Sequence, residues 1–280
     1  MVGSPGNVAL SAQTAGNDFL APFPAHHVIG NIYFIGSKGL GIYLITTPEG
    51  HILVNAGLAE SVPLIQQSIA KLGFKFSDIR ILLISHAHFD HDGGASRIKE
   101  LTDAKYVVME GDVPVVESGG KKDFFYGKTP NLLYPPAKVD RVVHDGDTVK
   151  LGDTVLTAHL TPGHTKGCTT WTFKVQDGGK SYDVVIVGSP NVNEGYKLVD
   201  NAAYPQIASD YERGFRVLRS LPCDVFLGAH GSYYGMDAKY ARIKDGAANP
   251  FIDPVGYKDY VKEREQSFRA ELAKQQAGAR

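Results

Sequence analysis

Cysteine is scarce in this sequence, because only Cys168 and Cys223 occur among its 280 residues. Two cysteines are too few for the disulfide framework of a small secreted domain, and the sequence alone does not decide whether they pair. Both are interpreted as small core residues. A chain of this length can bury roughly three quarters of its unfolded surface in a core, so it needs no crosslinks to be stable.

The chain also lacks an excess of charge and a long apolar run. It has 29 Lys and Arg against 30 Asp and Glu, a formal net charge of −1. This balance gives no reason to expect nucleic acid or a membrane surface as partner, and leaves a small molecule. No apolar run approaches the roughly 18 residues of a membrane helix. The first 20 residues lack the basic and apolar regions of a signal peptide.

Two halves of the sequence follow the same plan. Residues 31–54 alternate in the manner of short strands, residues 62–72 have apolar positions at helical spacing, and the apolar run 81–84 ends at a histidine. Strand-like residues 141–187, a helical pattern over 205–220 and the apolar run before His230 repeat this order. We therefore expect two similar β-rich halves with helices outside and strand ends meeting along one edge.

The remaining segments complete a single domain over residues 29–280. Residues 1–28 begin with a stretch that contains Gly, Ser, Asn and Gln and has no clear period, and we expect a flexible N-terminal arm there. Residues 119–137 have no clear period and predict a long surface loop beside the site. Apolar positions from Val255 onward predict a closing helix.

The polar residues crowd where the first half ends, in "SHAHFDHDGGA" at positions 85–95. Imidazole and carboxylate groups are ordinary ligands of a divalent ion such as zinc. A hydrogen-bonded polar loop is the alternative interpretation of any single histidine. The cluster favours a metal, because five of the ten histidines follow predicted strands: His86, His88, His91, His164 and His230.

At this point the sequence resembles the metallo-β-lactamase superfamily. The motif H-x-H-x-D-H stands here as "HAHFDH", and "TPGHTKGCTTW" and "GAHGSYYGM" are similar to the later metal motifs in the same order. The resemblance implies a four-layer αββα sandwich of the α+β class. It also implies two zinc ions, one held by His86, His88 and His164 and the other by Asp90, His91 and His230.

Within that superfamily the sequence resembles the subclass B3 metallo-β-lactamases. Many relatives carry a bridging aspartate after the strand "DVVIVG", where this chain has Ser189. The resemblance implies that Ser189 and Asn191 bind a substrate carboxylate and that Asp90, besides ligating, orients the nucleophile. Tyr196 is a candidate for contact with the oxyanion, and an aromatic that packs its own loop is the alternative. Asp92, an additional carboxylate, is expected to face solvent or to cap the following helix.

The resemblance implies a hydrolase that opens the ring of penicillins, cephalosporins and carbapenems by attack of a zinc-bound hydroxide. It further implies a monomer that acts on a small molecule and confers antibiotic resistance from the periplasm, after removal of a signal peptide. One alternative is another hydrolase of the same fold, acting on a lactone, an ester or a phosphodiester. The other is a metal-binding protein without catalytic activity.

Overall fold

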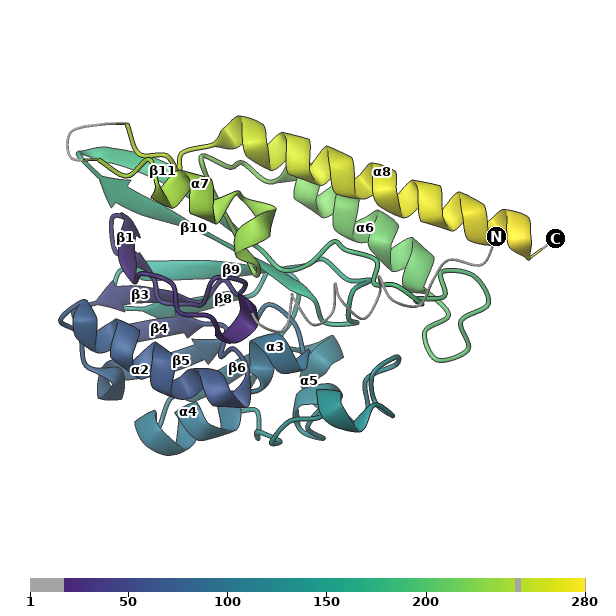
Figure 1. Cartoon of the computed structure of the whole chain (residues 1–280), viewed down its shortest axis with the longest axis horizontal. Helices are drawn as coiled ribbons and strands as arrows, with labels where there is room; N and C mark the ends of the chain where they lie inside the picture. The colour runs from purple at the N-terminus through teal and green to yellow at the C-terminus, as the bar shows by residue number, and fades with distance from the viewer. Residues whose placement is uncertain (1–17, 245–247, 280) are drawn as a thin grey trace.

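Two β-sheets lie face to face, and helices cover their outer faces, which gives layers in the order α, β, β, α (Figure 1). The computed structural model describes residues 18–244 and 248–279. Because helices cover the sheets from outside, the central strands are apolar on both faces. All five residues of β4 (Gly50–Val54), for example, are buried. The predicted αββα sandwich is confirmed.

The first sheet has seven strands in the order β1 to β7. β1 to β4 form an antiparallel meander, whereas β5, β6 and β7 each run parallel to the strand before them. Its other strands are β1 (His26–Ile29), β2 (Ile32–Phe34), β3 (Tyr43–Thr47), β5 (Ile79–Leu83), β6 (Lys105–Met109) and β7 (Arg141–Val143). The helices of this half are α2 (Val62–Lys71), α3 (Phe89–Asp92), α4 (Ala95–Thr102) and α5 (Val113–Val116).

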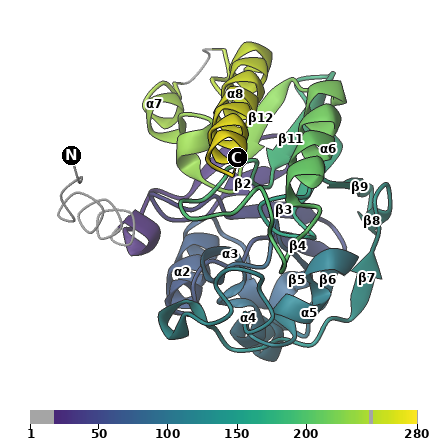
Figure 2. The same ribbon diagram turned by 90° about the vertical axis from the view of Figure 1, so that its right-hand side faces the viewer.

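The second sheet has five strands in the order β12, β11, β10, β9, β8. Only the pair β11 and β12 is parallel. These strands are β8 (Thr148–Leu151), β9 (Thr154–Leu160), β10 (Thr169–Asp177), β11 (Lys180–Val187) and β12 (Val225–Gly228). The helices of this half are α6 (Ile207–Ser220), α7 (Met236–Tyr240) and α8 (Pro254–Gly278). In the view of Figure 2, α2, α4 and α5 lie below the sheets, and α6 and α8 lie above them.

The core is divided between the layers by the two-residue period of the strands. Ile52 and Val54 of β4 belong to the same hydrophobic cluster as Trp171 of the second sheet. Leu53, between them in sequence, belongs to the cluster that contains Ile65 of α2. Successive side chains of a strand point to opposite faces, so one strand supplies both the core between the sheets and the core under the helices.

The two halves of the chain have the same order of elements. In each half an antiparallel meander is followed by a helix and then by a strand parallel to the last strand of the meander. The helix is α2 in the first half and α6 in the second, and the parallel strand is β5 or β12. Both parallel strands are apolar apart from the exposed Arg80 of β5, and they lead into the segments that carry the histidines.

The N-terminal boundary of the domain needs correction. We expected residues 1–28 to form an arm, but β1 begins at His26 and pairs with β2. Before it, the Lys38 amide donates a hydrogen bond of 2.9 Å to the Ala21 carbonyl oxygen. The Asp18 carboxylate lies 3.1 Å from the Lys38 ammonium. Residues 18–28 therefore pack on the domain, while residues 1–17 of the expected arm lie outside the described residues.

The helix predictions hold with small changes. α2 begins at Val62 and ends before Gly73, whose φ of +83° suits glycine. Ser61 does not cap it, because its hydroxyl accepts a hydrogen bond from the Leu58 amide instead. The predicted closing helix is α8, and the Asp253 carboxylate caps it by accepting from the Gly256 amide. Among the described residues, no helix has both the length and the apolar character needed to cross a membrane.

Candidate metal centre

The histidine cluster is held at the end of β5 by hydrogen bonds from neighbouring strands. The Ser85 amide donates to the Asn55 side-chain oxygen over 2.8 Å, and the Trp171 indole donates to the Ile84 carbonyl oxygen over 2.9 Å. Asn55 directly follows β4 and has a φ of +70°, a conformation that asparagine tolerates better than most residues. These hydrogen bonds fix the direction in which the chain leaves β5, and the segment of His86 and His88 leads from there into α3.

Three histidines form the first half of the centre. His86, His88 and His164 are buried, and each offers a ring nitrogen within 4.8 Å of those of the other two. The His164 Nδ1 donates to the Asn191 carbonyl oxygen over 2.8 Å, so its Nε2 is left for a metal. The His86 Nε2 is buried and has no hydrogen-bond partner among the described residues. A buried nitrogen without a partner is costly unless a ligand occupies it.

Asp90, His91 and His230 form the second half. The Nε2 atoms of His91 and His230 lie 3.1 Å apart, and Asp90 Oδ2 lies 3.2 Å from the first and 3.6 Å from the second. The other ring nitrogen of His230 donates to the Gly39 carbonyl oxygen over 3.1 Å. The turn that contains Gly39, between β2 and β3, thus contacts the centre and orients this ring. Asp90 and His91 also come within 4.8 Å of a His86 nitrogen, so the two halves adjoin.

Burial sets the charges of these groups. It lowers the pKa of His86 and His164 well below the usual range, and it lowers the pKa of His230 to about 4. These imidazoles are therefore neutral at pH 7, the form that binds metals. Burial alone would raise the pKa of Asp90, but contacts with His91 and His230 bring it below its usual value. Neutral imidazoles and one carboxylate are a donor set that fits divalent zinc.

A buried aspartate that the sequence analysis missed joins the two metal loops. Asp112 Oδ2 accepts hydrogen bonds from the Ala87 amide over 2.9 Å and from the Thr165 hydroxyl over 2.8 Å. Asp112 Oδ1 accepts from the Gly167 amide over 2.8 Å. Burial raises the pKa of Asp112 to about 6, so the carboxyl is still ionised at neutral pH. Asp112 thus stabilises the segment of His86 and His88 against that of His164.

The loops around Asp112 approach closely because glycine stands at both contact points. A Cβ atom on Gly167 would lie 2.4 Å from the Asp112 backbone nitrogen, and one on Gly111 would lie 2.5 Å from the Lys166 carbonyl oxygen. No side chain fits at those distances. Asp112 follows β6, the parallel neighbour of β5, and this position was the available signal, since the carboxyl ends of parallel strands meet at one edge.

The predicted loop at 119–137 contributes a second missed aspartate. Asp123 Oδ2 lies 3.6 Å from the His88 Nε2, and both atoms are buried without any other partner. Asp123 Oδ1 accepts from the amides of Phe125 and Tyr126 over 2.8 and 2.6 Å. The Tyr134 hydroxyl of the same loop donates to the Ala87 carbonyl oxygen over 2.9 Å. A carboxylate behind a ligating imidazole orients it and raises its basicity.

The candidate substrate residues lie after β11. The Ser189 hydroxyl is 3.1 Å from the Tyr233 hydroxyl, and the Asn191 side-chain amide donates to the same Tyr233 oxygen over 3.0 Å. Tyr196 is buried, and its hydroxyl donates to the His164 carbonyl oxygen over 3.0 Å. In this arrangement Tyr196 packs and stabilises the metal loop, the alternative left open by the sequence.

Asp92 departs from its expected place. It is fully buried, and its carboxyl accepts a short hydrogen bond from the Tyr106 hydroxyl. Burial raises the pKa of Asp92 to about 8, so it is neutral at pH 7. The expectation that it faces solvent or caps a helix is therefore wrong. The reason is the short α3, which turns Asp92 inward onto β6.

Cys168 is buried and Cys223 partly buried, and neither is in a disulfide.

Known proteins are similar to this chain in sequence and in fold. The model of the metallo-β-lactamase superfamily matches residues 42–230. The solved FEZ-1 metallo-β-lactamase of Legionella gormanii is 54% identical with a TM-score of 0.90, and the match covers 91% of this chain and 98% of that one. The solved subclass B3 metallo-β-lactamase BJP-1 of Bradyrhizobium japonicum is 42% identical with a TM-score of 0.89, and the match covers 95% and 100%.

Curated relatives are more distant. A metal-dependent hydrolase of Anaeromyxobacter dehalogenans is 27% identical over 215 residues, which cover 76% of this chain and 69% of the relative. A hydroxyacylglutathione hydrolase of a Bradyrhizobium species is 27% identical over 205 residues, which cover 73% and 67%. The chain therefore belongs to the metallo-β-lactamase superfamily of metal-dependent hydrolases, and it resembles the subclass B3 enzymes of that superfamily.

Proposed function

We propose that this chain opens the β-lactam ring of penicillins, cephalosporins and carbapenems with two zinc ions. Its similarity to two solved β-lactamases over nine tenths of the chain supports the substrate class. The observation that carries the proposal is Ser189, which stands after β11 near the metal centre in place of a bridging carboxylate. A neutral hydroxyl there can donate to a substrate carboxylate, whereas an aspartate would repel it.

The metal ligands are proposed as two sets of three. His86, His88 and His164 would hold one zinc, and Asp90, His91 and His230 the other, as their distances allow. When bound, zinc supplies an acidic water at neutral pH and polarises a carbonyl group. Three protein ligands per ion leave coordination positions open, which is typical of catalytic sites.

The other side chains have proposed roles around these ions. Asp90 would accept a proton from the attacking water and orient it, in addition to ligating. Ser189 and Asn191 would bind the substrate carboxylate. Tyr196 would hold the His164 loop through its hydrogen bond to that carbonyl oxygen. A contact between Tyr196 and the oxyanion would require this bond to break, so we assign it the positioning role.

The test is hydrolysis of a carbapenem and a cephalosporin by the purified chain, with zinc counted in the same sample. We expect turnover that a chelator abolishes, with close to two zinc ions per molecule. His164→Ala should abolish turnover, since it removes one of three ligands of an ion. The matched control is His144→Ala, because His144 is exposed and pairs only with the exposed Glu110. Full activity of His164→Ala, or zinc binding without turnover, would contradict the proposal.

A thioesterase is the second candidate, because one curated relative is a hydroxyacylglutathione hydrolase. The same protein sample would be assayed with a hydroxyacyl thioester of glutathione. Faster turnover of the thioester than of any β-lactam would favour this candidate. Bound zinc without turnover of either substrate would favour a metal-binding protein without catalytic activity.

The cellular role follows from the substrate. We propose that the chain acts as a monomer in the periplasm and confers resistance to β-lactams, carbapenems included. Export of the chain in a susceptible host should raise the carbapenem concentration that stops growth, and His164→Ala should not. Size-exclusion chromatography with light scattering tests the monomer.

A further inference from the structure

Tyr233 occupies the centre of the proposed carboxylate subsite. It lies three residues after His230, in the turn that follows β12. Its hydroxyl oxygen is 3.1 Å from the Ser189 hydroxyl and 3.0 Å from the Asn191 side-chain nitrogen. The two side chains expected to hold the substrate carboxylate are thus connected to each other through one phenol.

The direction of the protons in this group can be worked out. The Asn191 amide nitrogen only donates, so the Tyr233 oxygen accepts from it. A substrate carboxylate only accepts, so Ser189 must direct its own proton to that carboxylate. The Ser189 oxygen is then left to accept the Tyr233 proton. The result is a chain from Asn191 to Tyr233 to Ser189, in which each bond strengthens the next.

The Tyr233 ring is fixed on both sides. Its centroid lies 5.1 Å from that of the metal-centre ring His230 and 5.1 Å from that of Tyr260 on α8, on which it stacks with an interplanar angle of 28°. A phenol has an ordinary pKa of about 10, so the Tyr233 hydroxyl carries its proton at neutral pH. A fixed, protonated phenol can orient Ser189 before a substrate arrives, which lowers the cost of binding.

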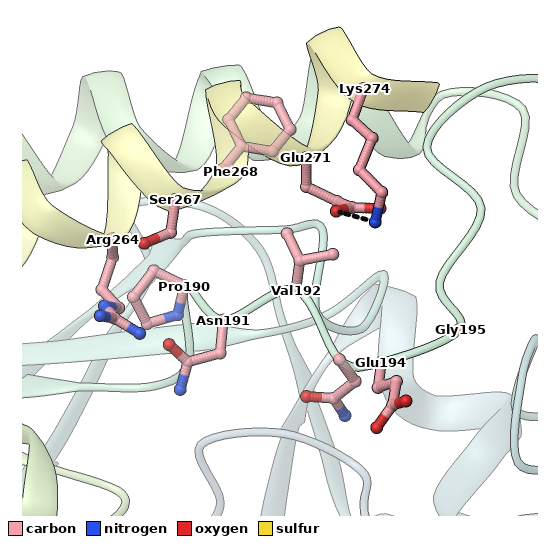
Figure 3. Close-up of a pocket in the computed structure, with 11 residues that line it drawn as sticks. Pro190, Asn191, Val192, Glu194, Gly195, Arg264, Ser267, Phe268, Glu271 and Lys274 are labelled. Atoms are coloured by element: carbon pink, nitrogen blue, oxygen red, sulfur yellow. Dashed lines mark hydrogen bonds and ion pairs between the residues drawn. The ribbon is translucent and has the colours of Figure 1, made fainter. Parts of the chain in front are cut away.

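Asn191 and Tyr233 border open space, whereas Ser189 is buried behind them. Asn191 and Tyr233 both line a cavity of about 430 Å³ between the turn after β12 and α8. Asn191 also lines a neighbouring cavity of about 440 Å³. Figure 3 shows this second cavity between α8, which carries Arg264, and the segment from Pro190 to Gly195.

We propose that Tyr233 is a positioning residue for substrate binding, whose hydroxyl orients the Ser189 hydroxyl and the Asn191 amide toward the substrate carboxylate. The inference rests on the proposed β-lactamase function and names a determinant of its substrate class, β-lactams that carry a ring carboxylate. The ring of Tyr233 packs against His230, and its hydroxyl forms hydrogen bonds with Ser189 and Asn191.

The experiment removes the hydroxyl and keeps the ring. Tyr233→Phe should raise KM for a cephalosporin by about three- to tenfold, the effect of one lost hydrogen bond, while kcat stays within about twofold. Tyr33→Phe is the matched control, because it removes a phenol hydroxyl from β2, where the Tyr33 ring packs against His27 and Phe74 and not against residues of the subsite. It should leave both constants unchanged.

Two further measurements separate the subsite from a structural effect. For the same cephalosporin with its carboxylate esterified, Tyr233→Phe and the wild type should have equal KM. In a Ser189→Ala background, Tyr233→Phe should raise KM by less than about twofold, since the connected groups are not additive. The zinc count of each variant should equal that of the wild type.

The inference is wrong if KM for the free acid does not change, if the ester shows the same increase, or if kcat falls together with the zinc count. Each of these results requires a wild type that hydrolyses the cephalosporin. If the wild type hydrolyses no β-lactam at all, the proposed function fails, and the inference falls with it.

Discussion

Replacing Asp112 tests whether its carboxylate holds the segment of His86 and His88 against the segment of His164. The variant Asp112→Asn keeps the size of the side chain and exchanges one acceptor oxygen for an amide group that donates. If that amide replaces Oδ1, the Gly167 amide loses its acceptor. If it replaces Oδ2, the Ala87 amide loses its acceptor, although Thr165 can rotate to accept. Either way at least one buried backbone N–H is left without a partner.

The loss of stability expected for Asp112→Asn can be derived from the number of buried N–H groups that lose their acceptor. One buried donor without an acceptor costs about 1–3 kcal/mol, so the free energy of unfolding of the metal-free protein should fall by about that amount. The loops of His88 and His164 would also be less well oriented. The loss of such support typically weakens metal affinity about 10- to 100-fold. The two effects should appear together, because they have one cause.

The assay is urea denaturation in the presence of a chelator, followed by competition for zinc with a chromophoric chelator. Asp237→Asn is the control, since Asp237 is exposed on α7 and the change should stay within about 0.5 kcal/mol. If Asp112→Asn behaves like this control in both measurements, Asp112 does not hold the loops. If only stability falls, Asp112 supports the fold without orienting the ligands.

Two further substitutions probe the same surroundings. In Asp123→Asn the remaining side-chain oxygen can still accept from the amides of Phe125 and Tyr126. The new amide group then faces the His88 Nε2 and cannot accept a hydrogen bond from it. Zinc affinity measured by competition should fall about 10- to 100-fold. The midpoint of urea unfolding without zinc should hardly move, and a large shift would assign Asp123 to stability instead. Gly167→Ala places a Cβ atom 2.4 Å from the Asp112 nitrogen, so the loops must separate. Denaturation should show a loss of about 1–3 kcal/mol, and wild-type stability would refute the close approach.

Local patterns in the sequence were enough to predict the elements that bear the site. The apolar run before His86 and the helical spacing over 62–72 and 205–220 correspond to β5, α2 and α6. Their periods reflect burial on one or two faces, which the order of residues records directly. Five histidines and Asp90 could be selected as candidate metal ligands because their types and spacing are chemically unusual.

Asp112, Asp123 and Tyr233 could not be selected in this way. Each is a single polar residue in an ordinary local context, and its importance comes from partners between 25 and 55 positions away. The environment of Asp92 was also mispredicted because it depends on a residue distant in sequence. It was expected to face solvent, and it is buried because Tyr106 lies beside it in the fold.

The sequence by itself therefore indicated the main strands and helices around the site, the similar order of elements in the two halves and the candidate metal ligands. These depend on hydrophobic period and on donor chemistry, which are local properties of the chain. Only the tertiary structure decided which buried carboxylates support the ligands, where the domain begins at its N-terminal side, and that one phenol connects Ser189 with Asn191. Those contacts form when distant loops meet at the edge of the sheets, and no local pattern encodes such a meeting.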